Sequence, residues 1–147
     1  WTRIGMRSYD MMFPYKDPAL LERELADLAQ AGLPELPFGY DARPADRLTG
    51  AEIKTLLTGH TIRGRDLKTG EVFTDLFGAD GTITENASWG DDYGKAISFD
   101  NDLICISMRD WGGSCSAILR RTEAVQSRYE EFIWVYGCCA YEFSVIK

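Results

Sequence analysis

Histidine is the scarcest reactive residue of this chain, with His60 the only one among 147 residues. Any Ser-His-Asp or Cys-His mechanism would therefore have to use this residue. His60 follows Gly59 at the expected junction of a helix and a strand, where residues commonly hydrogen-bond a free carbonyl of the helix end. We expect a structural role for His60 and no catalytic residue.

Short motifs that hold metals, nucleotides or phosphates are also missing. The chain has no C-x-x-C pair and only one histidine beside its four cysteines, so we expect no zinc site. Neither a G-x-x-x-x-G-K-[ST] loop nor a G-x-G-x-x-G unit between a strand and a helix occurs. The turns at Asp80-Gly81 and at 90–94 do not continue into a calcium loop. No metal and no cofactor are expected.

Positive charge and long apolar runs are both in short supply. Lysine and arginine number 16 against 23 acidic residues, which gives a net charge of −7 and disfavours nucleic acid and anionic lipid as partners. Arg63, Arg65 and Lys68 form a local basic cluster, which is either a small anion site or an ordinary solvated strand face. No stretch reaches the roughly 18–20 apolar residues of a membrane span. We expect neither nucleic-acid binding nor membrane insertion.

The first clear pattern that is present predicts a helix between Asp17 and Gly32. Asp17 is a good N-cap and Pro18 suits the first helical position. Gly32 suits the position after the last turn, and Pro34 prevents continuation. The apolar residues recur at helical spacing and are expected to form a buried stripe: Leu21, Leu25, Leu28 and Ala29.

A second, shorter helix is predicted to begin at Thr49, after a proline-rich linker over residues 34–47. Thr49 and Glu52 have the spacing of a capping box, and Gly59 supplies the stop. Its apolar stripe consists of Ile53, Leu56 and Leu57. We expect this helix to cover one open end of the domain that follows.

From His60 onward the apolar spacing changes from helical to alternating, with turn residues every 8 to 12 positions. The expected strands are 60–67, 71–77, 82–88, 95–99, 102–108, 114–121, 129–136 and 139–146. Connections this short make neighbouring strands antiparallel, and closure removes exposed edges. The predicted fold is mainly β (α+β by content), an antiparallel up-and-down β-barrel or compact sandwich of seven or eight strands, calycin-like, preceded by two short helices.

Two regions follow from these patterns: an N-terminal helical and linker region over 1–47, and a capping helix with the barrel over 48–147. The chain begins at Trp1 rather than at methionine, so we expect a piece of a longer protein. The alternation assigns one set of residues to the interior of the barrel: Val72, Ile83, Ile97, Phe99, Leu103, Cys105, Cys115, Ala117, Leu119, Ile133, Val135, Tyr141, Phe143 and Val145.

The cysteines lie in the last third of the chain, at positions 105, 115, 138 and 139. Cys105 and Cys115 fall on the same face of two strands joined by a hairpin near Asp110. This hairpin would place them opposite each other, so its geometry allows a disulfide between them. The alternative is four buried free thiols. A disulfide would favour the bacterial periplasm, and free thiols the cytoplasm.

Two stretches resemble a known family. Tyr15 to Arg23 (YKDPALLER), continuing through Ala31 to Glu35 (AGLPE), resembles the end of the tetratricopeptide region of proteobacterial class III adenylate or guanylate cyclases. Leu48 to Gly64 (LTGAEIKTLLTGHTIRG), with Asp80-Gly81 and the spacing from Leu103 to Cys115, is similar to a small bacterial β-domain that can follow such tails. The resemblance implies an accessory domain of a multidomain signalling protein, the rest of which is the expected partner. The resemblance assigns no catalytic residue to this chain.

Carboxylates and aromatic residues are the remaining candidates for a site. The carboxylates are mostly assigned to turns, where aspartate bonds its own backbone, and comprise Glu71, Asp75, Asp80, Glu85, Asp91, Asp92, Asp100, Asp102 and Asp110. Trp89, Tyr93 and Trp111 fall in or beside turns and either line the mouth of the barrel or plug its ends. Together with Phe73 and Arg63 they form the candidate ligand-binding set, for a small apolar or carbohydrate ligand.

Three functional hypotheses remain open. The first is a non-catalytic binding or regulatory domain, which requires a cavity near Trp89 and Trp111 or an exposed apolar patch over residues 9–13. The second is a small barrel-type hydrolase or isomerase, which requires at least two acidic side chains in one pocket. The third is a purely structural spacer.

Overall fold

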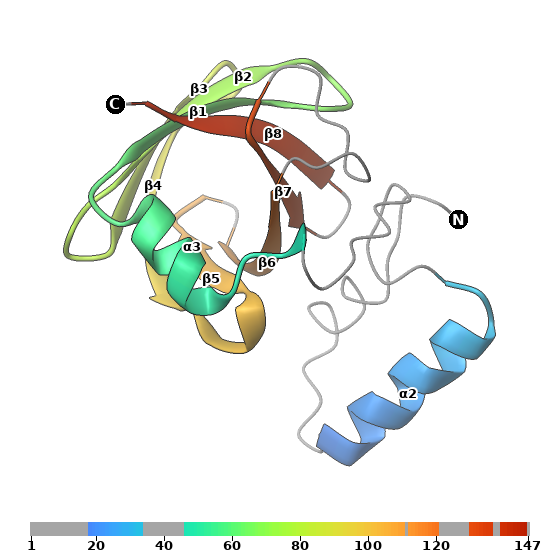
Figure 1. The fold of residues 1–147 in the computed structure, drawn as a ribbon. Helices are drawn as coiled ribbons and strands as arrows, with labels where there is room; N and C mark the ends of the chain where they lie inside the picture. The colour runs from blue at the N-terminus through green and yellow to red at the C-terminus, as the bar shows by residue number, and fades with distance from the viewer. Residues whose placement is uncertain (1–17, 34–45, 111, 121–129, 137–138, 147) are drawn as a thin grey trace.

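The alternating half of the chain forms eight strands that close into one barrel (Figure 1). The structure is a computed structural model and describes residues 18–33, 46–110, 112–120, 130–136 and 139–146. Each strand pairs antiparallel with the next along the chain, and β8 pairs with β1 to complete the closure. The strands are β1 (Thr61–Asp66), β2 (Val72–Phe77), β3 (Thr82–Ala87), β4 (Gly90–Ser98), β5 (Ile104–Met108), β6 (Gly112–Arg120), β7 (Phe132–Tyr136) and β8 (Cys139–Ile146). The predicted up-and-down barrel is confirmed.

Strand β4 begins five residues earlier than the sequence predicted. Residues 90–94 were assigned to a turn, but they continue the ladder with β3, in which Asn86 pairs with Asp91. The Asn86 side-chain amide donates to the Asp91 carboxylate at 2.8 Å, so polar residues that are typical of turns stabilise a strand pair here. The turn itself lies at Ser88 and Trp89.

Helix α3 (Gly50–Leu57) has the capping box that the sequence predicts. The Thr49 hydroxyl accepts from the Glu52 backbone N–H, and the Glu52 carboxylate accepts from the Thr49 backbone N–H at 2.8 Å. On its inner face Ile53 and Leu57 are fully buried in the main apolar core. Helix α3 therefore closes one end of the barrel, beside β5 (Figure 1).

Replacing Thr49 with alanine removes the side-chain acceptor of this box. We expect the free energy of unfolding to fall by about 1 kcal/mol, the usual cost of a lost N-cap. Urea denaturation measures the change. Thr55→Ala on the same helix is the matched control, because Thr55 is exposed and donates only to the Ala51 carbonyl within the helix. An equal loss in both variants would contradict a specific role for the cap.

The start of α3 packs closely against the 3₁₀ helix η3 (Asp100–Asp102), which links β4 to β5. The Gly50 backbone N–H donates to the Asp102 carboxylate at 3.0 Å. A Cβ atom on Gly50 would lie 1.8 Å from the Phe99 carbonyl oxygen, so only glycine allows this approach. The contact holds the helix over the end of the barrel.

The main core fills the barrel interior, and a second, smaller core lies outside it. The interior positions of β5, β6 and β7 include Ile104, Ile106, Ile118 and Trp134. The second cluster combines Ala117, Leu119, Ile133 and Val135 with the half-buried Leu103. These five residues alternate with the interior ones along the strands, so they face outward.

The interior assigned from the sequence is therefore inverted in four strands. Val72 is 49% exposed, and Phe73 points inward in its place. Cys105 and Cys115, like the five residues of the second cluster, alternate with residues of the interior. In β5, β6 and β7 both faces carry apolar residues that are buried, so alternation alone does not tell the inner face from the outer one. The assignments of Ile83, Phe99, Tyr141, Phe143 and Val145 agree with the main core and its packed neighbours, and the Ile97 side chain lies outside the described set.

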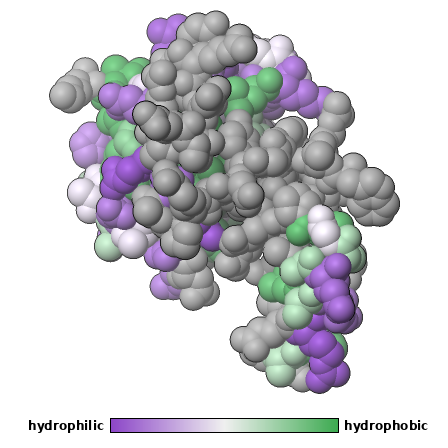
Figure 2. Space-filling view, turned by 45° about the vertical axis from the view of Figure 1, so that its right-hand side comes forward, coloured by the Kyte–Doolittle hydropathy of each residue, from purple (hydrophilic) through white to green (hydrophobic). Residues whose placement is uncertain are grey.

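Helix α2 (Pro18–Gln30) ends as predicted, with Gly32 at a φ of 83°. The Leu33 and Gly32 backbone N–H groups donate to the Leu28 and Ala29 carbonyls, which completes a Schellman motif. The expected buried stripe is only partly covered: Leu25 and Leu28 are half-buried, Ala29 is exposed, and the Leu21 side chain lies outside the described set. None of the described side chains of α2 belongs to either apolar core. Figure 2 shows hydrophilic residues gathered along one side of α2 and hydrophobic residues along the other.

Candidate functional site

A cavity of about 160 Å³ lies inside the barrel, toward the end opposite α3. Its walls come from six strands and the β3–β4 turn: Phe73, Asp75, Glu85, Trp89, Ile106, Ser114, Ser116, Trp134 and Tyr141. Trp89 is 45% exposed and marks the mouth, whereas Ile53 and Leu57 of α3 fill the other end. The barrel is thus closed at one end and accessible at the other.

Two carboxyl groups meet in this cavity. Asp75 on β2 stands directly opposite Glu85 on β3 in the antiparallel ladder, and each residue is only 8% exposed. Glu85 accepts a hydrogen bond from the Trp89 indole N–H at 2.8 Å, whereas the buried Oδ1 of Asp75 has no hydrogen-bond partner. A buried polar atom of this kind carries a free-energy cost that a bound ligand can remove.

The surroundings shift the acidity of both groups in the same direction. Burial, with a smaller contribution from the Glu85 carboxylate, raises the pKa of Asp75 well above its ordinary value of 3.8. Burial also raises the pKa of Glu85, assisted by Asp92 and opposed by the hydrogen bond from Trp89. The cavity therefore favours protonated carboxyl groups until a positive charge enters.

Two serine hydroxyls add further unpartnered oxygens to the same cavity. Ser114 and Ser116 occupy alternate positions of β6, and the Oγ atom of each is buried without a hydrogen-bond partner. Ser116 is only 1% exposed. Three buried oxygen atoms, from Asp75 and the two serines, thus lack partners around one space.

A third acid, Asp92 on β4, stands opposite Glu85 but is compensated by its own neighbours. Its carboxylate accepts backbone N–H groups from Tyr93 at 2.7 Å and Asp110 at 3.2 Å. The Arg109 guanidinium lies 3.8 Å away. Groups of the protein itself therefore satisfy the Asp92 carboxylate, whereas the buried Oδ1 atom of Asp75 has no such partner.

The residues proposed from the sequence divide between the cavity and the outer surface. Phe73 and Trp89 line the cavity, with ring centroids 6.2 Å apart. Tyr93 is 56% exposed on the outer face, where the Arg109 guanidinium lies 4.5 Å from its ring centroid, and Arg63 is exposed on β1. Neither is brought to the cavity. Trp111 and the apolar patch over 9–13 lie outside the described residues.

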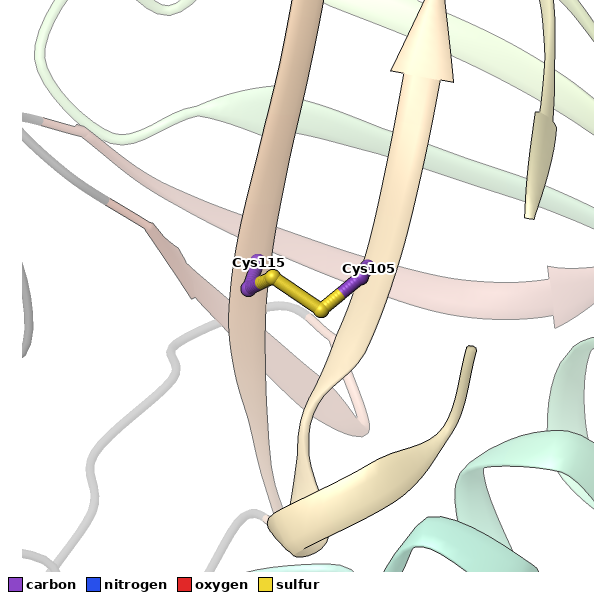
Figure 3. Close-up of a disulfide and its surroundings, with 2 residues drawn as sticks. All are labelled: Cys105 and Cys115. Atoms are coloured by element: carbon purple, nitrogen blue, oxygen red, sulfur yellow. A yellow bond between two sulfur atoms is a disulfide. The ribbon is translucent and has the colours of Figure 1, made fainter. Parts of the chain in front are cut away.

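The cysteines and the histidine lie away from this site. Cys105 and Cys115 stand opposite each other on β5 and β6 and form a disulfide, as Figure 3 shows. Cys139 lies at the start of β8 with a half-buried side chain. The His60 side chain is exposed, and its backbone N–H donates to the Leu57 carbonyl at 3.0 Å. The expected bond from this residue to the helix end is confirmed.

Sequence reasoning missed the meeting of Asp75 and Glu85 because it assigned the acids mostly to turns. That assignment holds for Asp80, whose carboxylate accepts from the Thr82 backbone N–H at 3.1 Å. Asp75 and Glu85 instead lie in mid-strand, each with apolar residues two positions away on both sides. An acid in such a place shares the inward face of its strand, and this signal could have identified both residues.

The unpartnered Asp75 predicts an unusual dependence of stability on pH. Because its pKa is raised in the folded protein, folding takes up a proton between pH 3.8 and that higher pKa. The stabilisation is complete below about pH 4 and is lost as the pH rises. Of the described residues, the titratable groups that line the cavity with Asp75 are Glu85 and Tyr141, and none of those residues is a base.

Replacing Asp75 with asparagine removes the ionisable group, so the loss of stability at high pH no longer occurs. The new side chain also supplies an amide donor for Glu85. We expect D75N to be more stable than the wild type by roughly 1–3 kcal/mol at pH 8, the usual cost of an unsatisfied buried group, and by less at pH 4. Urea denaturation across this pH range measures the difference. D91N removes the same charge from the exposed face of β4 and should show no such trend. A gain that grows on acidification would contradict the assignment.

Comparison of the chain with protein-family models, with curated proteins and with solved structures finds no match. Within the described ranges, no helix has the length and apolarity needed to cross a membrane. The same part of the chain contains no group of three or more His, Cys, Asp or Glu side chains placed to hold a metal ion. The fold and the cavity together define a closed eight-stranded antiparallel β-barrel with a polar and aromatic interior site.

Proposed function

We propose that this chain is a non-catalytic accessory module that binds a small ligand inside its barrel. The observation that carries the proposal is the cavity, which combines four aromatic rings with buried oxygens that have no partner. Binding sites for small molecules are typically concave, mostly apolar and equipped with a few convergent polar groups. A purely structural spacer would gain nothing from these buried polar atoms, which cost stability.

Residues 15–35 resemble the end of the tetratricopeptide region of class III cyclases, and residues 48–64 resemble a small bacterial β-domain that can follow such tails. This resemblance supports a place for the module within a larger signalling protein. In that setting the ligand would act on the parent protein through the barrel. Helix α3, which closes the barrel, is the first described helix after the linker. Through α3 the barrel is joined to the preceding chain.

The two tryptophans of the cavity offer a direct test with small single-ring probes. We expect at least one of benzyl alcohol, benzylamine and benzoate to shift the indole NMR signals of Trp89 and Trp134 in a saturable manner. Ser116→Leu fills the cavity and should abolish the shifts, whereas Ser107→Leu makes the same change at an exposed site and should preserve them. If no probe moves these signals, the binding function is wrong.

A second candidate is acid–base catalysis, because the cavity brings together the two acidic side chains that such a mechanism needs. Asp75 has a raised pKa and could donate a proton, while Glu85 could accept one. The two functions differ in the fate of the ligand. A compound that binds and is recovered unchanged supports the module, and conversion that stops in D75N supports the enzyme.

A further inference from the structure

The charge of the cavity is not balanced by the residues that line it. Among the described residues that line it, Asp75 and Glu85 are acids, and none is a lysine, arginine or histidine. Asp92 has Arg109 and two backbone N–H groups as partners, whereas the charged group that raises the pKa of Asp75 is another carboxyl group, that of Glu85. Buried carboxylates are normally paired with cations. The missing partner is therefore a positive charge that comes from outside.

Among the described residues that line the cavity, the buried atoms without a partner are all oxygens that can accept hydrogen bonds. They are the Oδ1 of Asp75 and the Oγ atoms of Ser114 and Ser116, each buried within the barrel. An alcohol has one hydrogen to donate, whereas a primary ammonium group has three donors and no acceptor. A primary ammonium group thus fits both the charge and the number of acceptors.

The aromatic walls fit a cation that carries a ring. Phe73 stacks edge-on against Tyr141 at 5.6 Å, and Trp134 stands 6.1 Å from Phe77 deeper in the barrel. The faces of such rings attract cations, most strongly when water is excluded. A cavity of about 160 Å³ is close to the roughly 150 Å³ that holds a benzene molecule. The space therefore admits one ring and a short side chain.

We propose that the cavity is a binding site for a small primary ammonium compound with one ring. Its ammonium group donates to the oxygens of Asp75, Ser114 and Ser116, and the Glu85 carboxylate adds negative charge beside it. Its ring packs among Phe73 and Trp134, below the mouth at Trp89. This inference rests on the proposed binding function and adds the chemical class of the ligand.

Benzylamine and benzyl alcohol test this class, since they share the ring and the chain length and differ in charge. At pH 7.5, titration calorimetry of the full chain should give at least tenfold tighter binding of benzylamine. D75N should weaken benzylamine at least tenfold and benzyl alcohol less than twofold. E85Q, which keeps an acceptor for Trp89, should also weaken benzylamine selectively. D91N lowers the negative charge equally at an exposed position and should leave both affinities within twofold.

Each other outcome overturns the inference in a recognisable way. If benzyl alcohol binds as tightly as benzylamine while shifting the signals of Trp89 and Trp134, the site takes a neutral ligand and the binding function survives. If D91N weakens benzylamine as much as D75N does, the attraction comes from overall charge and not from the cavity. If neither probe binds, the ammonium site is wrong, and if benzoate also leaves the signals of Trp89 and Trp134 unmoved, the proposed function is wrong as well.

Discussion

Replacing Phe143 with alanine is expected to lower the free energy of unfolding by about 3–5 kcal/mol, a large share of the roughly 5–15 kcal/mol that stabilises an ordinary domain. Phe143 is fully buried on β8, the strand that pairs with both β7 and β1. Its ring stacks on Phe132 at 5.4 Å and meets Trp134 edge-on at 6.0 Å. On the other side Gly64 allows close approach, because a Cβ there would lie 2.7 Å from the Phe143 Cβ. Loss of this ring removes contacts on both sides of the barrel seam.

Urea denaturation, followed by far-UV circular dichroism, measures this loss. Ile146→Ala on the same strand is the matched control, since Ile146 is 45% exposed and should cost less than about 1 kcal/mol. Phe143→Leu should fall between the two, because it retains much of the apolar volume. A cost for Phe143→Ala no larger than that of Ile146→Ala would mean that the barrel does not close around this residue.

Removal of the disulfide is the second change with a large expected effect. The bond between Cys105 and Cys115 closes a loop with a sequence separation of 10. In the chain-entropy model such a cross-link restricts the unfolded chain and stabilises the fold by roughly 3 kcal/mol. We therefore expect the double variant Cys105→Ser with Cys115→Ser to be less stable by about that amount.

A reducing agent provides the complementary measurement. It should lower the urea midpoint of the wild type toward that of the double variant and leave the double variant unchanged. Cys139→Ser, which replaces a cysteine of β8 outside the Cys105–Cys115 pair, should respond to reduction as the wild type does. If reduction leaves the wild-type midpoint unaltered, the two cysteines are free thiols in the protein.

The elements of the fold could be predicted from the sequence because their signals are local. The capping box at Thr49 and the glycine after α2 depend on residues within one or two turns of the helix. Strand positions followed from alternation and turn residues, except where Gly90 begins β4 inside an expected turn. Short antiparallel connections and the need to cover edges then led to the barrel.

The direction in which strands face could not be predicted in the same way. In β6, inward Ile118 alternates with outward Ala117 and Leu119, so every position in that stretch is apolar and buried. In β2, the acidic Asp75 faces inward and the apolar Leu76 faces outward, where it is 50% exposed. The polarity of these two residues therefore predicts the opposite orientation of the strand. The inner face is decided by which residues meet across the closed barrel.

The candidate site was still less accessible to sequence reasoning. Asp75 and Ser116 are 41 positions apart in the numbering and come from β2 and β6, which do not pair with each other. Only closure of all eight strands brings them to one cavity. Trp89 was found because aromatic residues near turns are candidates for a barrel mouth on general grounds. Phe73 was added to the same set as an aromatic residue of a strand.

A crystal structure of the wild-type protein soaked with benzylamine tests the account most directly. We expect one molecule inside the barrel, with its nitrogen within hydrogen-bond distance of the Asp75 Oδ1 atom and its ring between Phe73 and Trp134. Benzylamine bound only on the outer surface, with the space around Asp75 filled by ordered water, would contradict it.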